Sequence, residues 1–223
     1  MYWPNQSVRS LIGTRGVSRI MEQKLGVLAS GSGTNFQAII DACANGEIPA
    51  KVAILVSDQA DAYALERAKA AGIPTKIIDR RDFGSRKEFN LALADTLDKA
   101  DVDLVCLAGF MRLMSKSFVR RFKNRCLNIH PALLPSFPGL EGQKQTWDYG
   151  VKIAGCTVHY VDEGCDTGPI IIQRAVNVDE GCTIEELAAK ILVEEHLAYI
   201  EAIRLHLEGR LKVEGRRVKI LPE

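Results

Sequence analysis

Short apolar runs alternate with helical patterns along the first two thirds of the chain. The apolar runs cover 24–30, 51–58, 74–79, 102–108 and 126–130. Apolar positions at helical spacing lie between them, over 36–45, 62–71, 85–99 and 115–123. Buried strands that alternate with helices are typical of a parallel sheet covered on both faces. This part of the sequence therefore predicts a Rossmann-like α/β fold.

The last third of the chain carries a different pattern. Residues 153–161 and 169–178 are two consecutive strand candidates, joined by a segment short enough to let them pair antiparallel. A long helix is expected over 183–207 and a terminal hairpin over 211–220. Since no repeat or linker interrupts the chain, we expect one domain over 24–223. Its mostly parallel sheet is flanked by helices on both faces and gains antiparallel strands in the C-terminal third.

Residues 1–23 are expected to be a leader or a disordered extension. They contain Arg9, Arg15 and Arg19, and no acidic residue precedes Glu22. An organellar transit peptide has this composition, but the stretch is short and weakly amphipathic. We favour an added leader or an upstream start, with Met21 opening the working domain.

Charge and cysteine usage narrow the classes of partner. Lys and Arg number 29 against 28 for Asp and Glu, whereas a dedicated nucleic-acid binder needs a sizeable basic excess. No apolar run approaches the roughly 20 residues of a membrane span. The six cysteines form no C-x-x-C pair, which indicates reduced thiols rather than disulfides or a zinc site. We therefore expect a cytoplasmic protein with no metal and no nucleic-acid or membrane partner.

Three loops are candidates for the functional site. In open α/β sheets, ligands bind beyond the carboxyl ends of the strands, near the point where the strand order reverses. The segments 31–35, 109–114 and 128–142 follow predicted strands. The first of them, Gly31-Ser32-Gly33-Thr34-Asn35, leads straight into a helix and has free N–H groups that can hold one phosphate. The alternative is a plain turn in which Thr34 or Asn35 caps the helix.

An amide and an imidazole end the fifth predicted strand. Asn128 and His130 are two residues apart, so their side chains point to the same side and can meet an oxyanion. The alternative is a histidine packed beneath the Pro-rich loop 131–139. Asp166 lies in the turn before the next strand; if it reaches His130, it raises the imidazole pKa and favours the charged form. We interpret His159, His196 and His206 as mainly structural.

Four blocks of sequence, in order, resemble the phosphoribosylglycinamide formyltransferases, folate-dependent enzymes of purine synthesis. The blocks are GSGTN, LAGFMRLMS, LNIHPALLPSFPGL and GCTVHYVDEGCDTGPII. The resemblance runs from about Lys24 to the long C-terminal helix. It implies transfer of the formyl group of 10-formyltetrahydrofolate to the amine of 5′-phosphoribosylglycinamide, without a metal, by a monomer or homodimer.

The resemblance also implies the role of each site residue. Asn128, His130 and Asp166 form the catalytic set, with His130 protonated, and Gly33, Thr34 and Asn35 hold the substrate phosphate. Glu195 lies near the ribose hydroxyls, unless it is a solvated glutamate of the long helix. The expected folate contacts are Arg86, Met111, Arg112, Leu113, Met114, Asn128, Asp162, Glu163, Gly164, Cys165 and Asp166. The segment 24–122 is then the phosphate-binding half, and 123–223 the folate-binding and catalytic half.

One departure and two alternatives accompany this resemblance. Many family members have a histidine after Pro-Gly-Leu, where this chain has Glu141, so we expect the substrate-side loop to differ in charge and order. A formyltetrahydrofolate hydrolase or a methionyl-tRNA formyltransferase is the related alternative, but each usually carries a further domain. A regulatory nucleotide-binding module would explain the glycine-rich loop without explaining Asn128, His130 and Asp166 together.

Overall fold

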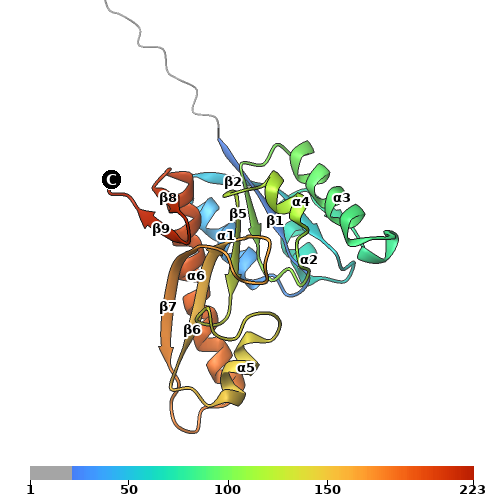
Figure 1. Ribbon diagram of the computed structural model, residues 1–223. Coiled ribbons are helices and arrows are strands. Elements are labelled where there is room, and N and C mark those ends of the chain that lie inside the picture. Colours follow the sequence, from blue (N-terminus) through green and yellow to red (C-terminus); the bar gives the residue numbers. More distant parts are fainter. Residues whose placement is uncertain (1–21) are drawn as a thin grey trace, which may run out of the picture.

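The computed structural model describes residues 22–223, so the predicted leader lies outside the described residues apart from its last two. Figure 1 shows the arrangement of the elements. The strands are β1 (Gln23–Leu28), β2 (Ala50–Ser57), β3 (Thr75–Ile77), β4 (Leu104–Leu107), β5 (Cys126–His130), β6 (Ile153–Tyr160), β7 (Ile170–Asn177), β8 (Leu211–Glu214) and β9 (Arg217–Ile220). The helices are α1 (Thr34–Ala44), α2 (Tyr63–Ala70), α3 (Arg86–Lys99), α4 (Lys116–Arg121), α5 (Gly142–Tyr149) and α6 (Ile184–Leu207), with a 3-10 turn at Arg80–Asp82.

The strands form a single sheet in the order β3-β2-β1-β4-β5-β6-β7-β9-β8. The first five strands in that order are parallel, and β6 pairs antiparallel with both β5 and β7. The terminal hairpin β8–β9 joins the same sheet, because β9 pairs with β7. The predicted fold class, including the antiparallel strands of the last third, is confirmed.

Alternation along the central strands divides the core between the two faces of the sheet. Leu25 and Val27 of β1 pack with α1, α2 and α6, whereas Leu28 faces the cluster built on α3 and α4. On β4, Leu104 belongs to the first of these clusters and Val105 to the second. Since both faces are covered, these strands consist of nearly continuous apolar residues, as buried parallel strands do.

Local sequence fixes the starts of the two longest helices. Ser85 caps α3 and Thr183 caps α6, and in each case the side chain accepts the N–H of a glutamate three residues later. That glutamate, Glu88 or Glu186, returns the hydrogen bond to the backbone of the cap. Such a capping box satisfies two N–H groups that the helix itself cannot pair. The start of α3 matters for the site, because it places Arg86 in its first turn.

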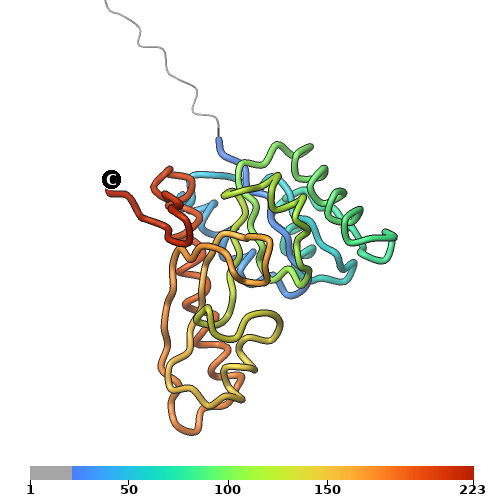
Figure 2. Tube along the Cα trace, viewed as in Figure 1, coloured from blue at the N-terminus to red at the C-terminus, as the bar shows by residue number. Residues whose placement is uncertain are grey.

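Helix α5 was not predicted. Its sequence, GQKQTWDY, is mostly polar, and only Gly142 and Thr146 of this helix are buried. Without an apolar stripe, helical spacing leaves no signal in the sequence. The helix packs against α6, and with β6 and β7 it extends away from α3 and α4, as Figure 1 and the trace in Figure 2 show.

Over residues 22–223, none of the helices combines the length and the apolar character that crossing a membrane requires.

Candidate functional site

A cleft of about 870 Å³ opens at the carboxyl ends of β1, β4 and β5. β1 and β4 are neighbours in the sheet, and the strand order reverses between them, so the cleft lies where ligands bind in open α/β sheets. Most of the predicted site residues line it: Thr34, Asn35, Arg86, Met111, Arg112, Leu113, Met114, Asn128, His130, Asp162, Gly164, Cys165, Asp166 and Glu195. Gly33 and Glu163 do not.

The three predicted catalytic side chains meet on one wall of the cleft. Asp166 Oδ2 lies 3.4 Å from Nδ1 of His130, and Asp166 Oδ1 lies 3.4 Å from the amide nitrogen of Asn128. Asn128 and His130 come from β5, and Asp166 comes from the loop that joins β6 to β7. Asp166 has a φ of 53°, a conformation that aspartate adopts more readily than most residues. Its carboxylate also accepts the Gly139 N–H at 2.7 Å.

The hydrogen bonds of His130 define its tautomer. Nε2 lies 2.8 Å from the carbonyl oxygen of Phe137, which can only accept a hydrogen bond. Nε2 therefore carries a proton, and in the neutral ring Nδ1 turns its lone pair toward Asp166. The side chain is nearly fully buried; Nε2 donates to the Phe137 carbonyl, whereas Nδ1 can donate to the nearby Asp166 carboxylate only when the ring is protonated. A ligand that binds His130 through Nε2 must take the place of the Phe137 carbonyl.

Burial decides the charge state of His130 in the free protein. It lowers the pKa of the imidazole below 6.5, and the charge of Asp166 opposes this only in part. The free site at pH 7 therefore favours the neutral imidazole, because desolvation outweighs the carboxylate. The expected protonation of His130 concerns the complex with the oxyanion and stays a prediction. Burial also opposes ionisation of Asp166, but the neighbouring His159, the Gly139 N–H and the charge of His130 lower the pKa of Asp166 to about 2.

His159 belongs to this cluster, although we interpreted it from the sequence as mainly structural. It pairs across the sheet with Asn128, and its Nε2 lies 3.2 Å from the Asn128 amide nitrogen and 3.6 Å from Asp166 Oδ1. Its Nδ1 lies 2.9 Å from the Tyr160 carbonyl, so Nδ1 carries the proton and Nε2 accepts from Asn128. His159 thus fixes the amide orientation of Asn128. Only the pairing of β5 with β6 could have revealed this.

The glycine-rich loop after β1 has the geometry of an anion site. Gly33 precedes α1 with a φ of 68°, and a Cβ atom there would lie 2.7 Å from Ala64 Cβ, so a side chain is excluded. The Ser32 carbonyl accepts a hydrogen bond from Arg67 at 2.8 Å, which holds the loop in place. The first N–H groups of α1 have no partner within the helix and are available to a phosphate.

Glu195 is not the solvated helix glutamate of the alternative reading. It is 5% exposed, and its carboxylate accepts a hydrogen bond from the Asn35 amide at 2.7 Å. Burial raises the pKa of Glu195, and the Asn35 hydrogen bond opposes that rise. The pair joins the start of α1 to the middle of α6 at the floor of the cleft, beside the glycine-rich loop.

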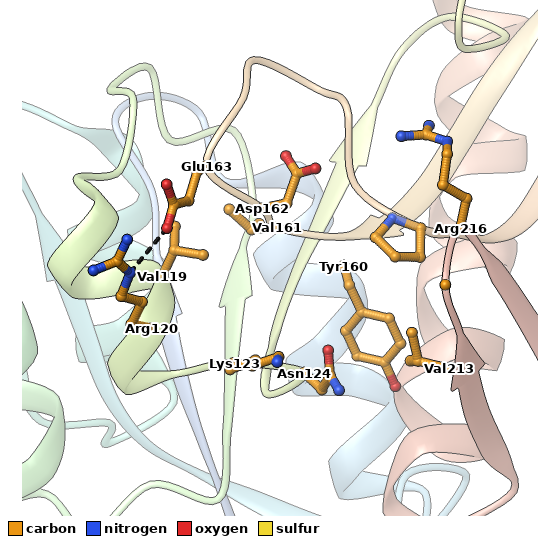
Figure 3. Close-up of a pocket in the computed structure, with 12 residues that line it drawn as sticks. Val119, Arg120, Lys123, Asn124, Tyr160, Val161, Asp162, Glu163, Val213 and Arg216 are labelled. Atoms are coloured by element: carbon orange, nitrogen blue, oxygen red, sulfur yellow. Dashed lines mark hydrogen bonds and ion pairs between the residues drawn. The ribbon is translucent and has the colours of Figure 1, made fainter.

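Glu163 points away from the cleft. Its carboxylate contacts Arg120 at 2.9 Å and Lys116 at 3.2 Å, and these contacts lower its pKa. It lines a second hollow of about 590 Å³ behind the loop, where Figure 3 shows Arg120 reaching toward it. At the other end of the loop, Arg216 donates to the Thr167 carbonyl at 2.9 Å. Glu163 therefore anchors the Asp166 loop to α4 instead of facing the cleft.

Within residues 22–223, no group of three or more His, Cys, Asp and Glu side chains is placed to hold a metal ion. The arrangement in the cleft instead combines a loop for an anion, an apolar strip and a cluster that can stabilise an oxyanion. Phe89, Met111, Leu113, Met114 and Val161 form the strip. This combination suits a reaction between a phosphorylated substrate and a flat, mostly apolar one.

Comparison with known proteins agrees with this chemistry. The sequence profile described as "Formyl transferase" matches residues 23–203. The phosphoribosylglycinamide formyltransferase of Haemophilus influenzae is 42% identical over 191 residues, which cover 86% of this chain and 90% of that protein. The crystal structure of glycinamide ribonucleotide transformylase 1 from Symbiobacterium toebii has 57% sequence identity and a TM-score of 0.88, covering 90% of this chain and 95% of that one.

Some relatives are much longer proteins. The trifunctional purine biosynthetic protein adenosine-3 of Chironomus tentans is 42% identical over 199 residues, which are 88% of this chain. The matched region is between 14% and 21% of the length of such trifunctional relatives. Since the family profile covers most of the residues, and the Haemophilus protein is similar over nearly its whole length, the chain belongs to the formyl transferase family.

Proposed function

We propose that the protein transfers the formyl group of 10-formyltetrahydrofolate to the amine of 5′-phosphoribosylglycinamide, a step of purine synthesis. The observation that carries the proposal is the meeting of Asn128, His130 and Asp166 on the wall of one cleft. The glycine-rich loop and Glu195 line the cleft where the ribonucleotide would bind, and the apolar strip suits the pterin. Two relatives that match 86% and 82% of this chain are named phosphoribosylglycinamide formyltransferase, which supports formyl transfer to this acceptor.

The reaction is an acyl transfer through a tetrahedral intermediate. The neutral glycinamide amine attacks the formyl carbon, and negative charge develops on the formyl oxygen. In our proposal this oxygen displaces the Phe137 carbonyl from His130 Nε2–H and draws the Asn128 amide away from Asp166. Two N–H donors then meet the oxyanion inside a partly buried site, where such contacts are stronger than in water.

The carboxylate of Asp166 stabilises the positive charge that develops on His130. The oxyanion favours a protonated imidazole: Nδ1 takes a proton from solvent as the intermediate forms and returns it to solvent when the intermediate collapses, and the ionised carboxylate of Asp166 stabilises that proton. A ring that is neutral in the free protein becomes charged only as the intermediate forms. Collapse of the intermediate releases N10 of the folate, which takes the proton lost by the amine. No covalent bond to the protein is needed.

The proposed function is tested by acceptor dependence. Purified protein is mixed with 10-formyltetrahydrofolate, and release of tetrahydrofolate is followed by absorbance with and without 5′-phosphoribosylglycinamide. We expect release only when the acceptor is present, with one formylated ribonucleotide formed per tetrahydrofolate. Release of formate at the same rate without acceptor would instead identify a formyltetrahydrofolate hydrolase.

Replacing Glu195 by glutamine is expected to weaken ribonucleotide binding. Glutamine keeps the shape of the side chain but removes the charge, and a hydrogen bond to a charged group contributes about 1.5–3 kcal/mol. We expect KM for the ribonucleotide to rise about 10- to 100-fold, with a smaller change in kcat. Steady-state kinetics with each substrate varied in turn measures both constants.

The matched control for this variant is Glu194→Gln. Glu194 is the preceding residue of α6, and its carboxylate contacts Arg174 at 3.4 Å without lining the cleft. We expect its KM values to match those of the wild type. An unchanged KM in Glu195→Gln, or equal changes in the two variants, would contradict the placement of the ribose beside Glu195.

Replacing Gly142 by alanine is expected to slow the chemical step without lowering stability. A Cβ atom at Gly142 would lie 3.2 Å from Nε2 and 3.3 Å from Cε1 of His130, so the imidazole must shift by a few tenths of an ångström. Catalytic rates depend strongly on the position of a reacting group, so a small displacement of the His130 imidazole should lower kcat about tenfold. Alanine also favours the first turn of α5, so the melting temperature should not drop. Stopped-flow kinetics and thermal unfolding measure the two effects.

Lys144→Ala is the control on the same helix. Lys144 is exposed and pairs with Asp148 one turn further on. We expect its kcat to equal that of the wild type. If Gly142→Ala also keeps the wild-type kcat, the imidazole does not act from the position that it occupies in the free protein.

A further inference from the structure

A second hollow lies outside the cleft, between α4 and the hairpin β8–β9. It is the hollow of about 590 Å³ that Glu163 lines, and this volume is ordinary for a small-molecule site. Among its lining residues, only Val161 and Asp162 also line the cleft. The loop 162–168, which carries Asp166, therefore borders both spaces. The formyl transfer proposed above does not use the hollow.

Much of the lining is apolar. Figure 3 shows the ring of Tyr160 between α4 and the hairpin, with Val119 on one side and Val213 on the other. The Tyr160 hydroxyl lies 2.9 Å from Nδ1 of His206, so it already has a partner. Pro169 adds to the apolar surface. A flat ring bound in the hollow would remove these apolar atoms from water, which is favourable.

The two segments that flank the hollow are strongly basic. Residues 116–125 and 210–220 together contain ten Lys and Arg and one Glu, whereas the whole chain has 29 Lys and Arg against 28 Asp and Glu. The rest of the chain therefore carries a net negative charge. Charges of one sign around a concave surface raise the local concentration of ligands of the opposite sign. The hollow should therefore attract anions.

Lys123 and Arg216 are cations of the lining without a carboxylate partner. Within residues 22–223, no Asp or Glu oxygen lies at ion-pair distance from either of them. Glu214, close to Arg216 in sequence, pairs with Lys212 at 2.9 Å and with Lys219 at 2.5 Å instead. Lys123 follows α4 and Arg216 lies in the turn between β8 and β9, on different sides of the hollow. A ligand that contacts both must extend across it.

Both carboxylates of the lining are already engaged. Glu163 is held by two cations of α4, as described above. Asp162 Oδ1 accepts the Gly164 N–H at 3.0 Å and the Thr167 hydroxyl at 2.7 Å. These contacts compensate part of the two negative charges, so the carboxylates repel a bound anion less strongly.

Arg216 connects the hollow to the catalytic cluster. Its guanidinium donates to the Thr167 carbonyl at 2.9 Å, and Thr167 directly follows Asp166. Oδ2 of Asp166 in turn lies 3.4 Å from Nδ1 of His130. An anion bound to Arg216 competes with the Thr167 carbonyl for the guanidinium. Loss of this hydrogen bond frees the end of the loop beside Asp166, so the carboxylate is held less firmly against His130.

We propose that this hollow is an inhibitory site for a nucleoside monophosphate, with the phosphate on Arg216 and the base on the ring of Tyr160. The phosphate carries nearly two negative charges at pH 7 and therefore competes well for the guanidinium. A base with carbonyl oxygens can accept hydrogen bonds from Lys123 at the other side of the hollow. The inference rests on the proposed function, because the bound ligand slows formyl transfer by loosening the loop that carries Asp166.

The binding test uses guanosine monophosphate, whose base carries such a carbonyl. Calorimetric titration measures its Kd on protein saturated with 5′-phosphoribosylglycinamide, so that the glycine-rich loop is already occupied. We expect one site, and guanosine, which lacks the charged group, should bind at least about tenfold more weakly. Inorganic phosphate should also bind more weakly, because it leaves the apolar lining exposed. Phosphate that binds as tightly as the nucleotide, or a nucleotide that does not bind at millimolar concentrations, would overturn the site.

Three single variants locate the bound nucleotide. Lys123→Gln and Arg216→Gln should each raise the Kd about threefold, within the range for an exposed ion pair, and Arg217→Gln should leave it unchanged. Arg217 is an exposed neighbour of Arg216 that does not line the hollow. Each variant loses one positive charge, so the comparison separates a site from general attraction. Equal Kd values in the three variants would overturn the assignment.

The inhibition test measures kcat with both substrates saturating. Saturating guanosine monophosphate should lower kcat about tenfold, because rates depend steeply on the position of a reacting group, and should leave both KM values unchanged. The concentration that gives half of this inhibition should rise in Lys123→Gln and stay the same in Arg217→Gln. A nucleotide that only raises the KM for the ribonucleotide acts at the glycine-rich loop, and this result would overturn the inference.

The failure of this inference is distinguishable from the failure of the proposed function, since calorimetry does not depend on activity. A protein that binds the nucleotide through Lys123 and Arg216 but transfers no formyl group retains the site and overturns the function. A protein that transfers the formyl group and neither binds the nucleotide nor responds to it retains the function and overturns the site.

Discussion

Replacing Asn128 by alanine is expected to lower kcat about 100- to 1000-fold, the usual cost of losing one oxyanion donor. Alanine removes the amide that lies between His159 and Asp166, so the developing charge on the formyl oxygen keeps at most the His130 donor. In the proposed complex the ribonucleotide phosphate binds at the glycine-rich loop, away from Asn128, so the KM for the ribonucleotide should change little. Rapid-quench measurement of the chemical step gives the effect directly.

The stability of the Asn128→Ala variant serves as the control. The Asn128 side chain is partly buried, so the substitution removes packing contacts as well as a hydrogen-bond donor. Thermal unfolding and the affinity for the ribonucleotide must therefore be measured together with the rate. A folded variant that binds the ribonucleotide normally and turns over within fivefold of the wild type would show that Asn128 is not an oxyanion donor.

Replacing Asp166 by asparagine is expected to reduce kcat about 100- to 10,000-fold, the range that a positioned proton-handling group contributes. Asparagine tolerates the positive φ at this position, so the loop should keep its course. The lost charge is what offsets burial at His130, so the pKa of His130 should fall further in the variant. NMR titration of the imidazole checks the pKa, and single-turnover kinetics checks the rate.

The pH dependence provides a second readout of the same contact. The pKa of Asp166 is lowered to about 2, so the carboxylate stays ionised through neutral and mildly acidic pH. His130, with its pKa lowered, binds its proton more readily in the unfolded chain than in the folded one, so it disfavours folding as pH falls below 6.5. A His130 pKa in Asp166→Asn equal to or above that of the wild type would contradict the coupling.

The hydrophobic periodicity of the sequence, and the rule that ligands bind at the carboxyl ends of parallel strands, predicted most of the residues that line the cleft. The apolar runs placed the five parallel strands, and the rule for open sheets selected the loops that line the cleft. The two-residue spacing of Asn128 and His130 correctly put both side chains on one side of β5. Apolar runs, strand ends and residue spacing are local properties, so they can be recognised in a single sequence.

The hydrophobic pattern did not predict contacts between segments that are distant in the sequence. His159 enters the cluster only because β6 pairs with β5 in a register that sets it opposite Asn128. Helix α5 has no apolar stripe, and its contact with His130 depends on packing against α6. The charge state of His130 depends on the balance between burial and one carboxylate, which no sequence motif expresses.

Following an isotopic label through one turnover shows whether Asn128 and Asp166 promote transfer of the formyl group to the ribonucleotide. The protein is mixed with 10-formyltetrahydrofolate carrying ¹³C in the formyl group and with 5′-phosphoribosylglycinamide, and the products are observed by NMR. We expect the label to appear in the formamide of the ribonucleotide, at a rate that Asn128→Ala and Asp166→Asn both reduce at least 100-fold. Label that accumulates as free formate would show that the protein is not a transferase, and label that reaches the ribonucleotide at an undiminished rate in both variants would show that these side chains do not stabilise the intermediate.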